Sequence, residues 1–397
     1  MKKIIVLFDM DNVLLTPGGY RMAYRDAMRF RLSKGNICDQ IPLNGLPEVF
    51  ESVGVTNEWD MMAITLAILV DQVFAKAGIP KEITDVADCI QWISEQSFAV
   101  DAIDFRQEIL EIVPFASPGE PVSLSLYKAS INGSTNSIFP NLKNLNILSK
   151  EILTHTADVF QSTLTRTFQN LILGSEQFEK AYNLKAEIQC DSYLEKFDQT
   201  NLSQNDLDWI EVQAKRGKIY PILFTARPSL PPKGIRNLDR FYSPEAEAGA
   251  RVVGLQNLPL IGMGRVDYMA NKNGRKLEEM LKPNSFHAVA SIFAANFQDE
   301  MKSLEAAYQL CFNNEITFFE EQNLQNAEVH VFEDSPGGVR SVINAIEKLN
   351  SFDQQIDLRI WGIADHADKV SALEKLGANV FSDLDSALLV FQKSIGD

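Results

Sequence analysis

The sequence predicts an α/β protein: a doubly wound parallel β-sheet with a large, mostly helical segment inserted after its first strand. Two observations support this fold class. Short apolar runs rich in β-branched residues, typical of strands buried on both faces, stand at the start of the chain and again in its second half. Amphipathic helical patterns separate several of these runs, as βαβ units require.

The expected strands begin with IIVLF, at residues 4–8. RSVINAIEKL and DKVSALEKL, which separate the last three expected strands, carry apolar residues at helical spacing. We therefore expect residues 1–15 and 216–397 to form one α/β domain. Its other strands are YPILFT (220–225), LPLIGM (258–263), VHVFED (329–334), LRIWGIA (358–364) and ANVFS (378–382).

Residues 16–215 have a different pattern and are expected to form a separate, mostly helical domain. SPGEPVSLSLYKASINGSTN, at 117–136, combines turn-forming residues with a short alternating segment, which predicts a hairpin or an ordered loop. The rest of the segment places apolar residues three and four apart, as amphipathic helices do. The expected helices are 21–32, 58–78, 83–96, 147–173 and 175–184.

The composition argues against two classes of partner. The chain has 397 residues and a formal net charge of −16, with no basic cluster long enough to mark a nucleic-acid patch. An acidic surface disfavours anionic membranes, and the most apolar helical segment, MMAITLAILV, is too short to span a bilayer. We therefore expect no nucleic-acid and no membrane partner. A small anionic substrate in a locally positive pocket remains compatible with this charge.

The cysteines and the first residues predict a cytoplasmic protein. The apolar run in MKKIIVLFDMD is too short for a signal peptide and ends in two acids. The cysteines have neither the spacing of a disulfide framework nor that of a zinc site: Cys38, Cys89, Cys190 and Cys311. The histidines show no metal spacing and are expected at surface or helix positions: His155, His287, His330 and His366. No feature of the sequence indicates an oligomeric state.

Two aspartates, Asp9 and Asp11, follow the first expected strand. Side chains two apart on a strand point to the same face, and open α/β sheets bind ligands at the carboxyl ends of their strands. Two converging carboxylates repel each other unless a proton or a cation relieves the repulsion, and Mg²⁺ suits oxygen ligands. A solvated turn is the alternative for the pair alone, but the buried strand before it favours a site.

Further polar residues follow two other expected strands. VHVFEDSPGG runs from an apolar strand into Glu333 and Asp334, which repeats the arrangement at the first strand. YPILFTARPS places Thr225 at the end of a third strand, followed by Ala226 and Arg227. A hydroxyl and backbone amides there are candidates for holding phosphate oxygens. Taken singly, each stretch also has an ordinary explanation as a turn or a strand end.

Taken in order, these positions resemble the four motifs of the haloacid dehalogenase-like hydrolase superfamily: Asp9-x-Asp11, Thr225, Lys282-Pro283 and Glu333-Asp334. The resemblance covers the α/β domain, a Rossmann-like core in that family, and the helical insert stands where the family has a cap domain. It implies a Mg²⁺-dependent phosphatase acting on a small phosphorylated metabolite. Specificity would lie in the cap, which carries no recognisable motif.

The resemblance also implies a role for each matched position. Asp9 would be the nucleophile that forms an aspartyl-phosphate, and Asp11 the general acid and then the base. Thr225 and Lys282 would hold the transferring phosphoryl group. The implied Mg²⁺ ligands are the Asp9 side chain, the Asp11 backbone carbonyl and Asp334, with Glu333 binding directly or through water.

Three departures from the family pattern are visible, one of which is a helical insert larger than the family's common caps. Asn12 stands where glycine is common, and asparagine tolerates left-handed backbone geometry better than most residues. FFEEQNLQNAE lengthens the interval between Lys282 and Asp334, so Lys272 or Lys276 is an alternative phosphate lysine. The proline and the expected long helix after Lys282 favour that residue.

Two other functions remain open at this point. The acid at Asp11 favours phosphate ester hydrolysis, because dehalogenases and phosphonatases of the superfamily lack it. A sugar-phosphate mutase would keep both acids and is the alternative enzyme. A non-catalytic member that binds a ligand or a partner is the alternative from another class, although the intact acids at every motif argue against it.

Overall fold

The computed structural model describes residues 2–33, 37–96, 100, 103–117, 119–132, 138–235, 240–315 and 324–396. The chain forms two compact units. The sheet unit is built from Met1–Gly18, Lys180–Asn183 and Leu194–Asp397, and the insert unit from Gly19–Glu179 and Leu184–Tyr193. The expected boundary after residue 215 is therefore wrong, because the chain rejoins the sheet unit at Leu194.

Two contacts explain why residues 194–215 belong to the sheet unit. Strand β3 (Gln199–Thr200) pairs with β2 (Leu15–Thr16), which follows shortly after the first strand. Helix α11 (Gln204–Lys215) then buries Ile210 in the apolar core of the sheet unit. The sequence of α11 is amphipathic like that of the insert helices, so its pattern alone did not separate it from them.

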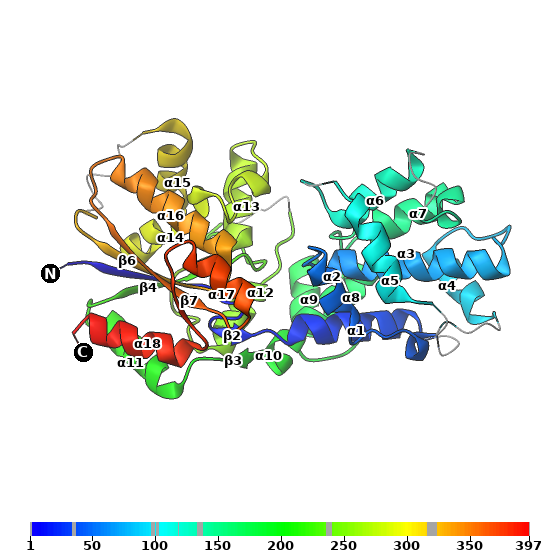
Figure 1. The fold of residues 1–397 in the computed structure, drawn as a ribbon, viewed down its shortest axis with the longest axis horizontal. Helices are drawn as coiled ribbons and strands as arrows, with labels where there is room; N and C mark the ends of the chain where they lie inside the picture. The colour runs from blue at the N-terminus through cyan, green and yellow to red at the C-terminus, as the bar shows by residue number, and fades with distance from the viewer. Residues whose placement is uncertain are drawn as a thin grey trace. The chain divides into compact units, whose positions relative to one another are not determined.

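Six parallel strands form the sheet, in the order β5-β4-β1-β6-β7-β8 (Figure 1). All six expected strands are confirmed, each within a few residues of its expected ends. Their bounds are Ile4–Phe8 for β1, Tyr220–Phe224 for β4, Leu260–Ile261 for β5, Glu328–Glu333 for β6, Asp357–Ile363 for β7 and Asn379–Phe381 for β8.

Helices cover both faces of the sheet, so the doubly wound fold is confirmed (Figure 1). Ile5 and Leu7 of β1 pack on one side with α14 (Ser285–Phe297), α15 (Glu300–Tyr308) and α16 (Pro336–Asn350). Val6 and Phe8 pack on the other with α11, α12 (Glu245–Val252) and α18 (Leu384–Ser394). Because successive strand residues point to opposite faces, only a continuously apolar strand such as IIVLF suits this position.

In the sequence, the remaining helices of the sheet unit lie between two strands or follow the insert. Ser335 begins α16 as its N-cap by accepting a hydrogen bond from the Gly338 N–H at 3.1 Å, with Pro336 in the first turn. Asn284 begins α14 in the same way through the Phe286 N–H. The other helices are α10 (Tyr193–Phe197), α13 (Met263–Lys272) and α17 (Ala367–Glu374).

The insert unit is helical, as expected. Its central helix, α3 (Glu58–Ala77), is buried along most of its length and packs against α1, α5, α6, α7 and α8. The bounds of the others are Gly19–Arg31 for α1, Leu46–Ser52 for α2, Val86–Ser94 for α4, Phe105–Ile112 for α5, Val122–Ile131 for α6, Asn146–Leu153 for α7, Thr163–Leu173 for α8 and Ser175–Tyr182 for α9.

Two expectations for the insert unit are wrong. The hairpin or loop expected at 117–136 contains helix α6, while residues 118 and 133–136 lie outside the described ranges. Its alternating sequence misled because the helix buries small polar residues, among them Ser123 and Ser130, on the same side as Leu126. The single helix expected at 147–173 is two helices, α7 and α8, and Ser162 caps the second of them through the Thr165 N–H.

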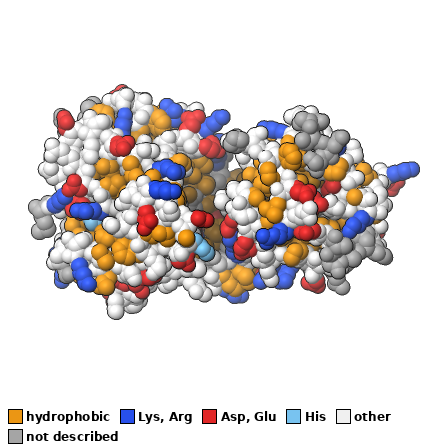
Figure 2. Space-filling model, viewed as in Figure 1, with side chains coloured by type: hydrophobic (Ala, Val, Ile, Leu, Met, Phe, Trp, Pro, Cys, Tyr) orange, Lys and Arg blue, Asp and Glu red, His pale blue; other side chains and the backbone are white. Residues whose placement is uncertain are grey.

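Two features bear on contact with a membrane or with a charged partner: the apolar character of the helices and the distribution of charged side chains. Within the described ranges, no helix combines the length and the apolar character that crossing a bilayer requires. Basic and acidic side chains are interspersed over the face of the protein that Figure 2 shows.

Two of the four histidines are buried inside the sheet unit. His330 lies in β6, against the expectation of a surface or helix position, and accepts a hydrogen bond from Trp361 Nε1 at 3.0 Å. His287 lies in α14, a helix as expected, with its Nε2 at 2.9 Å from the Ile261 carbonyl. His155 and His366 are exposed.

Candidate functional site

The topology of the sheet creates a crevice between β1 and β6. From β1 the chain continues to β4 and β5 on one side, and from β6 it continues to β7 and β8 on the other. Open α/β sheets bind ligands at such a switch point, outside the carboxyl ends of the strands. Phe8 pairs with Phe332, and the Asp9 N–H donates to the Phe332 carbonyl at 3.0 Å. The two acidic sequences therefore meet in one place.

Asp9, Glu333 and Asp334 form a buried carboxylate cluster at this crevice. One oxygen atom of each lies within 4.8 Å of the others. Burial and the charge of Glu333 raise the pKa of Asp9 well above its ordinary value. The same two causes raise the pKa of Asp334. Three carboxylates this close in a site away from water require nearby positive charge to stay ionised.

Lys282 supplies part of this positive charge. Its Nζ donates to Asp9 Oδ1 at 2.9 Å and to Glu333 Oε2 at 2.8 Å, and lies 3.9 Å from the centroid of the Phe224 ring. Burial lowers the pKa of Lys282, but Asp9 and Glu333 outweigh burial and raise it above the ordinary value. Lys282 is therefore a charged ammonium group, held between the ends of β1 and β6.

Of the three lysines considered from the sequence, Lys282 is the one that reaches the carboxylate cluster. Lys272 is exposed and pairs with Glu305 at 2.7 Å, and Lys276 is exposed. The long interval after Lys282 is occupied by α14, α15 and the π-helical turn Gln309–Asn313. Of the FFEEQNLQNAE stretch, residues 318–323 lie outside the described ranges.

Glu333 is fixed by the turn that begins α16. Ser335 donates to Glu333 Oε1 from its Oγ at 2.7 Å and from its backbone N–H at 3.2 Å. A Cβ added at Gly338 would lie 2.0 Å from Glu333 Oε2, so glycine is needed for this close approach. With Lys282 on Oε2 and Ser335 on Oε1, both carboxylate oxygens of Glu333 have hydrogen-bond donors.

Asp334 has two partners, Asn12 and Lys369, and the sequence indicated neither of these contacts. Asn12 has a φ of 58° and donates from Nδ2 to Asp334 Oδ2 at 3.0 Å. The left-handed conformation that asparagine tolerates is thus the one that this position adopts. Lys369 also donates to Asp334 Oδ2. It lies in α17, after β7, and only the pairing of β7 with β6 brings it near the cluster.

Asp11 is bound by Arg227. Arg227 Nε lies 2.9 Å from each carboxylate oxygen of Asp11, and Nη2 also donates to Oδ1. The third nitrogen, Nη1, lies 2.9 Å from Oδ2 of Asp198. Arg227 was a candidate phosphate-binding residue, but its guanidinium group lies between two carboxylates instead. Asp198 was not identified from the sequence, where it stands in no motif.

Thr225 and Ala226 form the end of β4, beside β1. Thr225 is buried, its N–H donates to the Ile261 carbonyl at 3.2 Å, and its Oγ1 accepts from the Arg227 N–H at 3.1 Å. Because a hydroxyl both accepts and donates, this arrangement leaves the hydroxyl hydrogen of Thr225 to donate to a ligand. Ala226 is exposed.

A cavity large enough for a small ligand lies beside two residues that contact the carboxylate cluster. A cavity of about 470 Å³ is lined by Asn12 and Lys369, the two partners of Asp334. Its other lining residues come from the ends of β7 and β8 and from the β2–β3 pair: Thr16, Asn201, Ile363, Ala364, Asp365, His366, Ser382, Asp383, Leu384 and Asp385.

The donors of the cluster fit a hard divalent cation. Three buried carboxylates face two lysines, Lys282 and Lys369, so one negative charge in the cluster is not compensated. The donors are all oxygen atoms, which is the preference of Mg²⁺. A bound cation would relieve the repulsion that raises the pKa of Asp9.

The chain is similar to a known protein in its fold. No protein-family model and no curated protein matches the sequence. Among solved structures, the X-ray structure of a Northeast Structural Genomics Consortium target is similar over 99% of this chain and 98% of that chain, with a TM-score of 0.58 and 16% sequence identity. At this identity the similarity shows the fold alone: a six-stranded, parallel α/β core with a helical insert.

Proposed function

We propose that this protein is a Mg²⁺-dependent phosphatase of the haloacid dehalogenase-like superfamily that hydrolyses a small phosphorylated metabolite through an aspartyl-phosphate. The observation that carries the proposal is the contact of Lys282 with both Asp9 and Glu333 at the switch point of the sheet. A nucleophilic carboxylate, an ammonium group and further carboxylates in one crevice are the components that phosphoryl transfer needs.

In the first half-reaction a carboxylate oxygen of Asp9 attacks phosphorus. The bond between phosphorus and the ester oxygen breaks as the bond to Asp9 forms. The carboxyl group of Asp11 gives its proton to the leaving oxygen, which departs as an alcohol. Lys282 and the Thr225 hydroxyl offset the charge on the phosphoryl oxygens, because phosphoryl transfer depends mainly on positioning and electrostatic stabilisation.

In the second half-reaction water attacks the phosphorus atom of the aspartyl-phosphate. The Asp11 carboxylate takes a proton from this water, and the bond between phosphorus and the Asp9 oxygen breaks. Inorganic phosphate leaves, Asp9 is again a carboxylate, and Asp11 again carries the proton it needs for the next cycle. The same residue is thus the acid of one step and the base of the other.

Asp9, Asp334 and the backbone carbonyl of Asp11 would hold the Mg²⁺ ion. The ion supplies positive charge that reduces the repulsion between the Asp9 carboxylate and the phosphate. Glu333 would act through water, because Lys282 and Ser335 already bind both of its carboxylate oxygens. Its main contribution is then to orient Lys282 toward the nucleophile.

Hydrolysis of p-nitrophenyl phosphate, with and without Mg²⁺, tests the proposal. We expect Mg²⁺-dependent turnover that Asp9→Asn abolishes and that Asp357→Asn, at a surface aspartate paired with Lys2, leaves unchanged. A selective enzyme can refuse this artificial ester, so binding of beryllium fluoride with Mg²⁺ is measured in parallel. Binding of beryllium fluoride without phosphate release would point to a selective phosphatase or to the mutase. The absence of both turnover and binding would contradict the proposal and favour a non-catalytic binding protein.

A further inference from the structure

The position of Arg227 concerns the general acid rather than the substrate. All three guanidinium nitrogens have carboxylate partners: Nε and Nη2 with Asp11, and Nη1 with Asp198. The Arg227 side chain is 2% exposed and that of Asp198 is 0% exposed, whereas that of Asp11 is 34% exposed. A buried arginine thus presents its planar, two-pronged donor edge to a carboxylate that faces solvent.

The surroundings of Arg227 leave this orientation little freedom. Asp198 is itself fixed, because its Oδ1 accepts from the Gly18 N–H at 2.9 Å. The carbonyl of Arg227 accepts from the Met263 N–H at 3.0 Å. Helix α12 packs so closely that a Cβ added at Gly249 would lie 3.1 Å from Arg227 Nη1.

A phosphate group would compete poorly for this guanidinium. To bind phosphate, Arg227 would have to release Asp11 or Asp198, and release of Asp198 would leave a buried carboxylate without its cation. Asp11, in contrast, gains a defined orientation because its Oδ1 accepts from both Nε and Nη2 of Arg227, while its exposed side stays open to the leaving group and to water.

We propose that Arg227 is a positioning residue that orients Asp11 for proton transfer, and that Asp198 is a second positioning residue that holds Arg227. This inference rests on the proposed phosphatase function and deepens it. Under this inference Arg227 orients the general acid Asp11 and does not bind phosphate. Asp198, a residue outside every motif of the sequence, orients Arg227.

The test uses two esters of similar shape that differ in their need for an acid. Nitrophenolate leaves without protonation, whereas the more basic leaving group of phenyl phosphate needs a proton. Arg227→Lys keeps the charge but loses the two-pronged geometry, and Asp198→Asn keeps an oxygen for the Gly18 N–H. Since general acid catalysis contributes about 100-fold or more, we expect both variants to lower kcat/KM for phenyl phosphate at least about 10-fold more than for p-nitrophenyl phosphate. KM is expected to change little.

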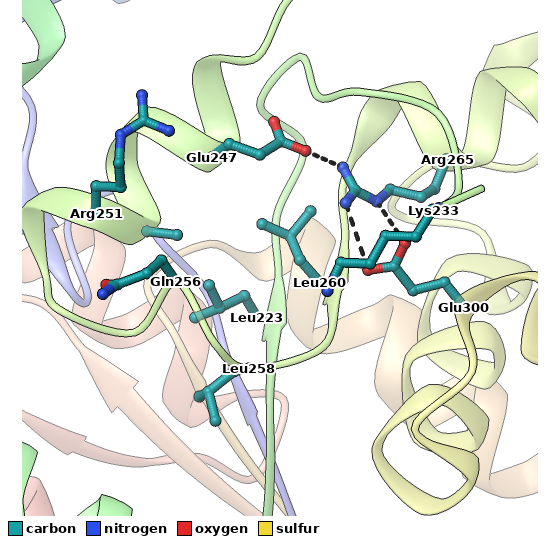
Figure 3. Close-up of a pocket in the computed structure, with 10 residues that line it drawn as sticks. Leu223, Lys233, Glu247, Arg251, Gln256, Leu258, Leu260, Arg265 and Glu300 are labelled. Carbon is teal, nitrogen blue, oxygen red and sulfur yellow. Dashed lines mark hydrogen bonds and ion pairs between the residues drawn. The ribbon is translucent and has the colours of Figure 1, made fainter. Parts of the chain in front are cut away.

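Arg265 provides a matched control in the same unit. It is also a buried arginine between two carboxylates, Glu247 and Glu300, and lines a cavity of about 290 Å³ (Figure 3). Arg265→Lys is expected to lower the melting temperature as Arg227→Lys does, but to leave the ratio of the two kcat/KM values unchanged. In an Asp11→Asn background, Arg227→Lys is expected to have no further effect on this ratio.

Each remaining outcome overturns a defined part of the inference. If Arg227→Lys raises KM for both esters at unchanged kcat, Arg227 binds phosphate. If it lowers kcat/KM, which reports the steps up to the aspartyl-phosphate, equally for both esters, or changes the ratio further in the Asp11→Asn background, its effect does not pass through Asp11 as the general acid. Asp198→Asn gives the same readout should Arg227→Lys fail to fold. A wild type without activity on any phosphate ester would overturn the proposed function and this inference together, whereas an active wild type with unchanged ratios overturns this inference alone.

Discussion

At the scale of single residues, the candidate site consists of charges that are fixed by short-range contacts. Glu333 has no room to move, because Lys282, Ser335 and the backbone at Gly338 surround its carboxylate. A side chain that is held in this way can orient Lys282 toward Asp9 without further adjustment. The position of the Glu333 carboxylate depends on the absence of a side chain at Gly338, so a substitution of Gly338 tests this packing directly.

Gly338→Ala is expected to destabilise the protein by about 1–3 kcal/mol, because the new methyl group would overlap the Glu333 carboxylate. The displaced carboxylate would also leave Lys282 poorly oriented, so activity is expected to fall with stability. Gly337→Ala is the matched control, since a Cβ at Gly337 meets no atom within 4 Å. Urea unfolding of both variants measures the difference, and equal stability of the two would contradict the predicted overlap.

At the scale of elements, the site is assembled from the turns that follow strands. The turn after β1 is closed by the Leu15 N–H, which donates to the Met10 carbonyl at 2.9 Å, and by the Asn12 N–H, which donates to the Leu15 carbonyl at 2.7 Å. It aims Asp11 toward Arg227 and Asn12 toward Asp334. The turn therefore connects the two acidic sequences, and its geometry depends on the left-handed conformation of Asn12.

Substitutions of Asn12 separate the backbone contribution from that of the side chain. Asn12→Gly keeps the left-handed conformation and loses the hydrogen bond to Asp334, which is expected to cost about 1–2 kcal/mol. Asn12→Ala loses the same bond and adds backbone strain, so we expect a further loss of about 1 kcal/mol. Thermal unfolding of the two variants tests this order. A more stable Asn12→Ala would show that the turn changes its conformation.

At the scale of the whole molecule, the two apolar cores of the sheet unit contain histidines that stay neutral. Burial lowers the pKa of His330 to about 4, against the smaller and opposite influence of Glu328. Burial also lowers the pKa of His287, to about 3, and the charge of Lys282 adds to this effect. Protonation of either ring would place a charge in an apolar core, so both histidines link the stability of the fold to pH.

His330 is expected to make the fold less stable as the pH falls from 6.5 to 4. In this window the unfolded chain, with an ordinary histidine pKa of 6.5, binds a proton that the folded chain does not bind. The free energy of unfolding is therefore highest above pH 6.5 and is lost on acidification, by about 2 kcal/mol at pH 5.

His330→Gln isolates this contribution, because glutamine cannot take up the proton but can accept the Trp361 N–H bond. The difference in unfolding free energy between wild type and variant is expected to change by about 2 kcal/mol between pH 7 and pH 5. His366→Gln, at an exposed histidine, is the control and should follow the wild type. A constant difference across this range would show that His330 is not neutral in the fold.

The sequence predicted the sheet and the carboxylate cluster because both depend on local patterns. Each strand is a short apolar run whose burial on both faces is visible in its composition, and each site residue stands directly after such a run. The parallel arrangement places both acidic sequences at the same edge of the sheet, and the strand order, which only the structure shows, makes β1 and β6 neighbours. Lys282 was identified by the proline and helix that follow it.

The sequence could not predict contacts made by residues without a local pattern. Asp198 and Lys369 stand in ordinary surroundings, and long-range pairing alone brings them to Arg227 and Asp334. Helix α6 was missed because its buried serines break the helical pattern of apolar residues, although they pack and form hydrogen bonds inside the insert unit. Residues 204–215, which form helix α11, were assigned to the wrong unit for a related reason: an amphipathic sequence shows that one face is buried, but not which part of the protein covers it.

The sequence by itself therefore determined which segments become strands of the six-stranded sheet, that helices cover both faces of this sheet, and which acids follow two of its strands. Only the tertiary structure decided the partners of the charged side chains: Lys282 for Asp9 and Glu333, Lys369 for Asp334, and Arg227 for Asp11 and Asp198. The physical reason is that apolar burial follows from the order of neighbouring residues, whereas a buried charge is stable only beside a partner that the fold brings from elsewhere in the chain.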